Sequence, residues 1–154
     1  MIDISRYTPN LQPEIKTFVL NILSEFGFNF DQKLDFDLDD PQKYYPDTGG
    51  VFYVACDNNK IVGTIAIKIK NGIPVLKRFY VDKKCRGKGI GSSLFDKAIL
   101  FCKDKKYKKI TLDTNNKFCN AFEMYKKKGF KTVNTNNKPA CSSCTCHIYM
   151  EKEL

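Results

Sequence analysis

The residues best suited to chemistry form a short glycine-rich turn, Arg86-Gly87-Lys88-Gly89-Ile90-Gly91. A β-branched and aromatic run at 75–82 precedes this turn, and apolar residues at helical spacing begin with Ile90. Glycines let the backbone approach a ligand closely, and the N–H groups at the start of a helix attract anions. The stretch therefore predicts a strand, an anion-binding turn and a helix, and the turn predicts a phosphate-bearing cofactor.

Two better-known phosphate-binding motifs do not fit this spacing. A Walker loop needs serine or threonine directly after its Gly-Lys pair, but Gly89 follows the pair here. A dinucleotide fingerprint would place its third glycine at Ser92 or Leu94. The pattern that remains is Arg-x-x-Gly-x-Gly, filled by Arg86, Gly89 and Gly91.

The elements that would position the turn follow from hydrophobic periodicity. Apolar residues at i, i+3 and i+4 predict helices over 15–26, 90–102 and 118–125. β-rich runs predict strands at 2–7, 51–55, 61–69, 75–82 and 110–113, with two last strands near 130–134 and 145–152. A strand, a helix and a strand between 75 and 113 imply a right-handed crossover and a parallel strand pair.

The composition bounds the class of protein. With 154 residues and 42% hydrophobic content, the chain fits a single domain over 1–154. The sequence has no long apolar run and no signal-peptide pattern at its N-terminus, so we expect no membrane association. Seven cysteines, an odd number and mostly scattered, favour reduced thiols, which predicts a cytoplasmic location. The net charge of +9 favours anionic ligands without choosing among them.

Four segments together resemble the GNAT family of N-acetyltransferases, which transfer an acetyl group from acetyl-CoA to an amine. Leu76–Asp82 is similar to the central strand of that family and Arg86–Gly91 to its pyrophosphate turn. Ala121–Phe130 is similar to its late helix, and Tyr149–Leu154 to its closing strand. The segments occur in the order of the family, from about residue 51 to the end. The resemblance implies an α/β fold of the mixed α+β kind, with a mostly antiparallel mixed sheet and helices on both faces.

The resemblance also implies the residues that bind acetyl-CoA. The backbone near Phe79, Tyr80 and Val81 would pair with the amide-rich pantetheine arm, much as a peptide adds to a sheet edge. The turn and helix start would bind the pyrophosphate through Arg86, Gly87, Lys88, Gly89, Ile90, Gly91 and Ser92. Lys84 is a further basic side chain near the phosphates.

Tyr125 is the catalytic candidate that the resemblance implies. The acid tyrosine of the family stands four residues before a Gly-Phe pair, as Tyr125 stands before Gly129-Phe130. It would protonate the departing thiolate; the alternative is a tyrosine that only continues the apolar face of its helix. Val75 and Phe118 occupy positions where many relatives carry a glutamate and an asparagine.

These departures leave the general base unassigned. A water relayed through backbone carbonyls or a carboxylate from residues 31–40 could serve, and Tyr80 and Asp82 are further candidates. Residues 25–47 hold seven carboxylates against two lysines, a local contrast with the basic remainder. We predict that 27–50 is a loop or short helix on the acceptor side. We also hypothesise that the acidic stretch 31–40 borders the acceptor site and attracts a cationic amine.

Two other patterns are interpreted without a function. Cys141, Cys144, Cys146 and His147 lie close in sequence, but neighbours in an extended strand point to opposite faces, so we expect no metal. The basic run at 103–109 suits a solvated helix end, which favours cations, better than a nucleic-acid site.

The sequence thus predicts an acetyl-CoA-dependent N-acetyltransferase acting directly on a primary amine, either a small molecule or a peptide. A non-catalytic acyl-CoA sensor or scaffold stays open as an alternative, as does a nucleotide- or nucleic-acid-binding domain. Neither the acceptor nor the oligomeric state follows from the sequence, and a homodimer is compatible with it.

Overall fold

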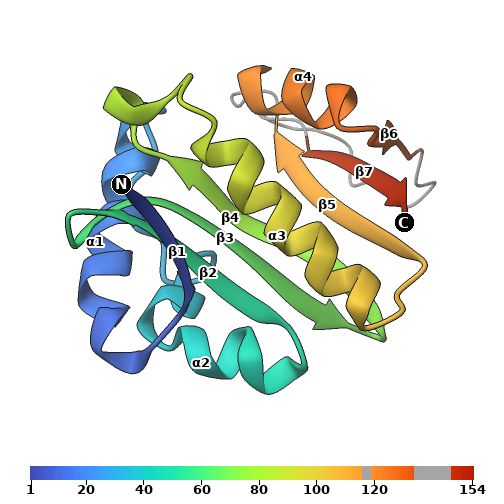
Figure 1. Cartoon of the computed structure of the whole chain (residues 1–154), viewed down its shortest axis with the longest axis horizontal. Coiled ribbons are helices and arrows are strands. Elements are labelled where there is room, and N and C mark those ends of the chain that lie inside the picture. The colour runs from blue at the N-terminus through green and yellow to red at the C-terminus, as the bar shows by residue number, and fades with distance from the viewer. Residues whose placement is uncertain (116–118, 134–146) are drawn as a thin grey trace.

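The computed structural model describes residues 1–115, 119–133 and 147–154 (Figure 1). Its strands are β1 (Ile2–Arg6), β2 (Val51–Asp57), β3 (Lys60–Lys70), β4 (Ile73–Val81), β5 (Lys109–Asn115), β6 (Lys131–Thr132) and β7 (His147–Glu153). Its helices are α1 (Gln12–Glu25), α2 (Pro41–Tyr44), α3 (Ile90–Asp104) and α4 (Cys119–Lys127). Every helix and strand predicted from periodicity is present, with boundaries shifted by a few residues.

The strands form a seven-stranded sheet in the order β1-β2-β3-β4-β5-β7-β6. Neighbouring strands are antiparallel except for β4 and β5, which are parallel because α3 connects them. The predicted mixed, mostly antiparallel sheet and the parallel pair are therefore confirmed.

Helices cover both faces of the sheet, and β2 shows why. Val51, Tyr53 and Ala55 belong to the core under α3, whereas Phe52 and Val54 belong to the core under α1. Because successive strand residues point to opposite faces, a strand buried on both faces is a continuous apolar run. The 3.6-residue periodicity of α1 and α3 places one apolar stripe of each helix on its own face.

The central feature of the sheet is the separation of β4 from β5. The two strands pair only at Val75–Thr111 and Leu76–Leu112, at or before the middle of each strand. Beyond Leu112, β5 stays paired with β7 as far as Asn115, while β4 stays paired with β3 as far as Val81. The strands therefore diverge beyond Leu76 and Leu112, and a gap opens in the sheet.

A β-bulge shapes the diverging part of β4. Tyr80 pairs with Thr64 and Lys77 with Ala66, so β4 has one more residue than β3 in this interval. Arg78 occupies the bulge with a φ of 52°, and its carbonyl oxygen accepts a hydrogen bond from Thr64 Oγ1 at 2.8 Å. Side chains on the two sides of the bulge consequently differ in phase.

Residues 27–50 cross the α1 side of the sheet between α1 and β2. They contain α2 and two short 3-10 helices, Phe36–Asp39 and Pro46–Thr48, in place of one long helix. Tyr45 is buried and packs edge-on against Phe52, with ring centroids 5.3 Å apart. Gly50 closes the segment, because a Cβ there would lie 1.9 Å from the carbonyl oxygen of Ile67. The segment is thus fixed to the sheet at its C-terminal end.

Candidate active site

A cavity of about 1060 Å³ lies along the gap between β4 and β5. The end of α1, residues 28–37, the turn after β4 and the inner side of α4 complete its wall. The predicted residues that line it are Phe79, Tyr80, Val81, Arg86, Gly87, Gly89, Ile90, Gly91, Ser92 and Tyr125. Lys88 is exposed beside the turn and does not line the cavity. Nearly all the residues predicted to bind acetyl-CoA or to act in catalysis therefore line one cavity.

The glycine turn offers bare backbone to this cavity. Gly87 and Gly89 have φ angles of 80° and 83°, and no atom lies within 4 Å of a Cβ built on either. The first helical hydrogen bond joins Ser93 N to Gly89 O at 3.0 Å. Within the described chain, no protein acceptor is recorded for the N–H groups of residues 90–92. The start of α3 therefore has the donors and the dipole that an anion requires.

Arg86 links the turn to two other elements. Its Nε donates to Val81 O at 3.0 Å, and its Nη2 lies 3.3 Å from Glu25 Oε2 at the end of α1. Both side chains of the ion pair are partly exposed. In the structure as it stands, the guanidinium binds protein groups at the border of the cavity.

The edge of β4 beyond the split is exposed to the gap. Asp82 N donates to Val62 O at 2.8 Å. Because backbone groups alternate in direction along a strand, Tyr80 and Asp82 direct their N–H and C=O groups to β3. The residues between them, Phe79 and Val81, direct theirs to the opposite side. An amide-bearing ligand in the gap could pair with Phe79 as a short added strand would.

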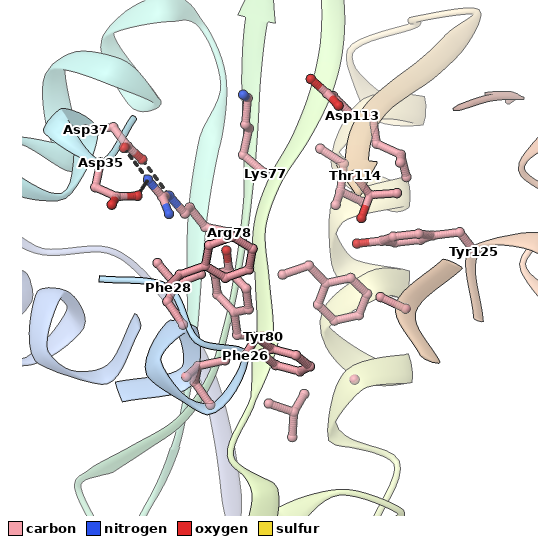
Figure 2. A pocket seen from close by; sticks show the side chains of 18 of the residues that line it. Phe26, Phe28, Asp35, Asp37, Lys77, Arg78, Tyr80, Asp113, Thr114 and Tyr125 are labelled. Carbon is pink, nitrogen blue, oxygen red and sulfur yellow. Dashed lines mark hydrogen bonds and ion pairs between the residues drawn. The ribbon is translucent and has the colours of Figure 1, made fainter. Parts of the chain in front are cut away.

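Tyr125 reaches the same gap from α4. Its ring packs against those of Phe79, at 6.2 Å, and Phe130, at 5.7 Å, and only 6% of its surface is exposed. Figure 2 shows its hydroxyl directed toward Thr114 on β5. Burial raises the pKa of Tyr125 above the ordinary 10.0, so the hydroxyl keeps its proton in basic solution.

A buried ion-pair network lies in the part of the cavity lined by residues 28–37. Arg78 Nε donates to Asp37 Oδ2 at 2.9 Å, and Arg78 Nη2 donates to Asp37 Oδ1 at 2.6 Å and to Asp35 Oδ1 at 3.0 Å. Tyr45 also donates to Asp37. Burial opposes ionisation of Asp37, but the hydrogen bonds and charge of Arg78 hold its pKa below the ordinary value.

This network changes the interpretation of the acidic stretch. Asp35 and Asp37 are buried and bound to Arg78, so one of their two negative charges is already compensated within the protein. Asp39 pairs with Lys16 outside the cavity wall. The carboxylates we expected to attract a cationic amine thus have internal partners, which sequence spacing did not reveal.

Lys77 and Asp113 are two cavity residues that sequence reasoning missed as a pair. Each comes directly after the last residue through which its strand pairs with the other, Leu76 on β4 or Leu112 on β5, and Figure 2 shows them on opposite sides of the gap. Desolvation lowers the pKa of Lys77, and the charge of Asp113 opposes this shift. The sequence offered no signal for this pair, because it does not show where β4 and β5 stop pairing.

The other candidates for a base are placed less favourably. Asp82 caps the turn by accepting from Lys84 N at 2.8 Å and does not line the cavity. Tyr80 lines it, but burial raises its pKa, which disfavours the phenolate a base would need.

Cys141, Cys144 and Cys146 lie outside the described residues, as does the side chain of His147. In the described ranges, no group of three metal-ligating side chains is recorded. No helix within those ranges has the length and apolarity needed to cross a membrane. The described site therefore consists of an anion-binding turn, an open strand edge and a protonated tyrosine around one cavity in an α/β fold.

Comparison with known families agrees with this class. Residues 48–132 match the acetyltransferase (GNAT) domain. The chain is 33% identical over 96 residues to human N-acetyltransferase 8B and 34% identical over 100 residues to N-acetylaspartate synthetase of Xenopus tropicalis. These matches cover 58% and 63% of the chain but only 42% and 37% of those two relatives.

Solved structures extend the similarity over the whole chain. A GNAT-family acetyltransferase of Staphylococcus aureus Mu50 is 31% identical, with a TM-score of 0.89 and coverage of 100% of this chain and 99% of that one. A Bacillus anthracis acetyltransferase in complex with acetyl coenzyme A is 28% identical, with a TM-score of 0.60 and coverage of 68% and 62%. The chain belongs to the GNAT family of acetyltransferases.

Proposed function

We propose that this protein transfers an acetyl group from acetyl-CoA directly to a primary amine. The observation that carries the proposal is the single cavity that joins the turn at 86–92, the free edge of β4 and the hydroxyl of Tyr125. Membership of the GNAT family supports an acyl-CoA-dependent acetyl transfer.

The residues around the cavity suit acetyl-CoA. The open backbone at Gly87 and Gly89 and the free N–H groups of α3 suit the pyrophosphate. Phe79 offers backbone groups to the pantetheine amides, and the exposed Lys84 and Lys88 can meet the ribose phosphate. Bound there, acetyl-CoA supplies an acetyl group activated as a thioester.

The residues of the chain then have distinct roles in the transfer. The amine nitrogen forms a bond to the acetyl carbon while the carbon–sulfur bond breaks, and Tyr125 gives its proton to the departing sulfur. Asp113 is the carboxylate we assign to take the proton that the amine loses, because it lines the cavity just past the split. Exchange with solvent restores both side chains.

Release of free thiol from acetyl-CoA in the presence of an amine panel tests the proposal. Tyr125→Phe should lower kcat roughly 100-fold or more while the Kd for acetyl-CoA changes little, since only the transferred proton is lost. An unaltered kcat at every pH would refute the role of Tyr125.

Val75 stands where many relatives carry a glutamate, and this difference favours one alternative, a protein that binds acyl-CoA without turnover. Calorimetry should show acetyl-CoA binding and none of NAD or short DNA. Binding of acetyl-CoA without thiol release for any amine would support the sensor and refute the enzyme. The reverse binding preference would refute both.

A further inference from the structure

Lys77 brings an ammonium group to the part of the cavity lined by residues 28–37, the proposed acceptor half, where the charges of Asp113 and Asp37 act on it. It pairs in the sheet with Ala66, which belongs to the core under α1, so its side chain lies on the α1 side of the gap. In Figure 2 its ammonium group lies above Arg78, between Asp37 on one side and Asp113 on the other. Among the residues that the structure describes, no ion pair or hydrogen bond of this ammonium is recorded.

Arg78, its neighbour, has the opposite situation. Its guanidinium binds both oxygens of Asp37, one oxygen of Asp35 and the carbonyl oxygen of Leu34. Only 10% of the Arg78 side chain is exposed. Because Arg78 is bound to protein groups, its guanidinium is not available to a ligand, and it compensates one of the two carboxylate charges of the network.

Lys68 adds a second cation beside Lys77. It lies two residues after Ala66 on β3 and therefore on the same face of the sheet, and it also lines the cavity. Its ammonium lies 5.8 Å from the centre of the Tyr44 ring, and no ion pair to a described residue is recorded. Two ammonium groups on adjacent strands thus face one part of the cavity.

We propose that the acceptor is an amine that also carries a carboxylate, an α-amino acid, whose carboxylate binds Lys77 with support from Lys68. This inference rests on the proposed acetyl transfer and names the substrate class of that site. The carboxylate at Lys77 directs the adjacent amine into the gap toward Asp113, which faces Lys77 from β5. Phe26, Phe28 and Tyr80, which Figure 2 shows on the other side of Arg78 from the Lys77 ammonium, give the cavity wall an aromatic surface for the amino-acid side chain.

Lys77 and Asp113 carry opposite charges, which suit the carboxylate and the amine of an amino acid. One carbon separates the amine from the carboxylate, so fixing the carboxylate leaves the amine few positions. A charge-assisted hydrogen bond from a partly desolvated ammonium is stronger than a neutral one. Loss of that bond corresponds to roughly 10- to 100-fold in affinity.

Matched acceptors test the inference. Each α-amino acid of a panel is compared with its amide and with the amine that lacks the carboxyl group, for example phenylalanine, phenylalaninamide and 2-phenylethylamine. Rates are compared at equal concentrations of neutral amine. We expect at least one amino acid to have a KM tenfold or more below that of its amide.

Variants separate binding from folding. Lys77→Ala should raise KM for the amino acid about tenfold or more with little change in kcat. It should leave KM for the amine that lacks the carboxyl group within about twofold. Lys77→Arg, which keeps the charge, should restore much of the affinity. Lys70→Ala is the matched control, because Lys70 is an exposed lysine on β3 outside the cavity wall. Circular dichroism confirms that each variant folds.

The outcomes distinguish the preference for amino acids from the acetyl transfer itself. Transfer to amines with equal KM for acids and amides, or a Lys77→Ala effect that is the same for both, would overturn the inference and leave the acetyl transfer standing. Acetyl-CoA binding without transfer to any amine would overturn the proposed function and the inference with it.

Discussion

The two halves of the cavity, which we propose bind the cofactor and the acceptor, are lined by different kinds of groups. The cofactor half consists mainly of backbone, with left-handed glycines and free N–H groups at the start of α3. The acceptor half consists of side chains held by a buried network, in which Arg78 joins β4 to residues 35 and 37. The difference teaches that a backbone site depends on local spacing, whereas a side-chain site depends on contacts between distant segments.

Arg78→Ala should have the largest effect and should fall on the acceptor half. Removing one partner of a buried ion pair typically costs about 3–5 kcal/mol, because the remaining charges lose their compensation. Chemical denaturation should show a loss of that size in the free energy of unfolding. Lys16→Ala is the control, since its partly exposed pair with Asp39 should contribute less than about 1 kcal/mol. Equal losses in both variants would remove the distinction between the network and a surface pair.

The same network should make stability depend on acid. The pKa of Asp37 is lowered from 3.8, so its contribution is fully present above that value and is lost as the pH falls through the lower folded pKa. The melting temperature of the wild type should drop in this range. Asp37→Asn, which starts from a lower Tm, should lose less on acidification. A parallel decline of both proteins would contradict the assignment.

Gly89→Ala should affect the cofactor half. Its φ of 83° strains any L side chain by about 1–2 kcal/mol, and the added methyl group would occupy the open space at the turn. Calorimetry should show acetyl-CoA affinity reduced about tenfold or more, since that space is where backbone would meet phosphate.

Gly72→Ala is the matched control for this prediction. Gly72 has a φ of 75° with no atom within 4 Å of a Cβ, but it lies in the turn between β3 and β4, outside the cavity wall. The two variants should lose similar stability while only Gly89→Ala loses affinity. A similar loss of affinity in both would argue against a phosphate site at the turn.

Glu25→Gln should give the smallest effect and test the contact between the halves. It frees Arg86 from a partly exposed ion pair that contributes at most about 1 kcal/mol. Acetyl-CoA should bind a few-fold more tightly when the guanidinium is released, and the gain should shrink at high salt. Weaker binding would indicate instead that the pair supports the turn.

Prediction from the sequence succeeded where the cause was local. The spacing of Gly89 and Gly91 before an apolar stripe predicted a turn that leads into a helix, and the apolar spacing through Tyr125 predicted the helix that carries it. The parallel pairing of β4 and β5 followed from the helix between them. Each of these inferences needed only a short stretch of chain.

The acceptor half could not be predicted in the same way. Arg78 and Asp37 stand 41 positions apart, and their contact depends on how residues 27–50 cross the sheet. The acidic stretch was interpreted as a source of free negative charge, because composition does not show that two of its carboxylates are bound. Lys77 was taken only as part of a strand, since its significance comes from where β5 diverges.

The bulge at Arg78 shifts the alternation of side chains along β4 by one residue. Lys77 and Arg78, although consecutive, both lie on the α1 side, and Phe79 then turns to the core under α3, where it meets Tyr125. Deleting Arg78 would remove the extra residue and restore regular pairing with β3, leaving Phe79 and Tyr80 on their present faces but removing the guanidinium that binds Asp35 and Asp37. The extra residue therefore lets β4 present both Lys77 and Arg78 on the α1 side while Phe79 still meets Tyr125 on the other face.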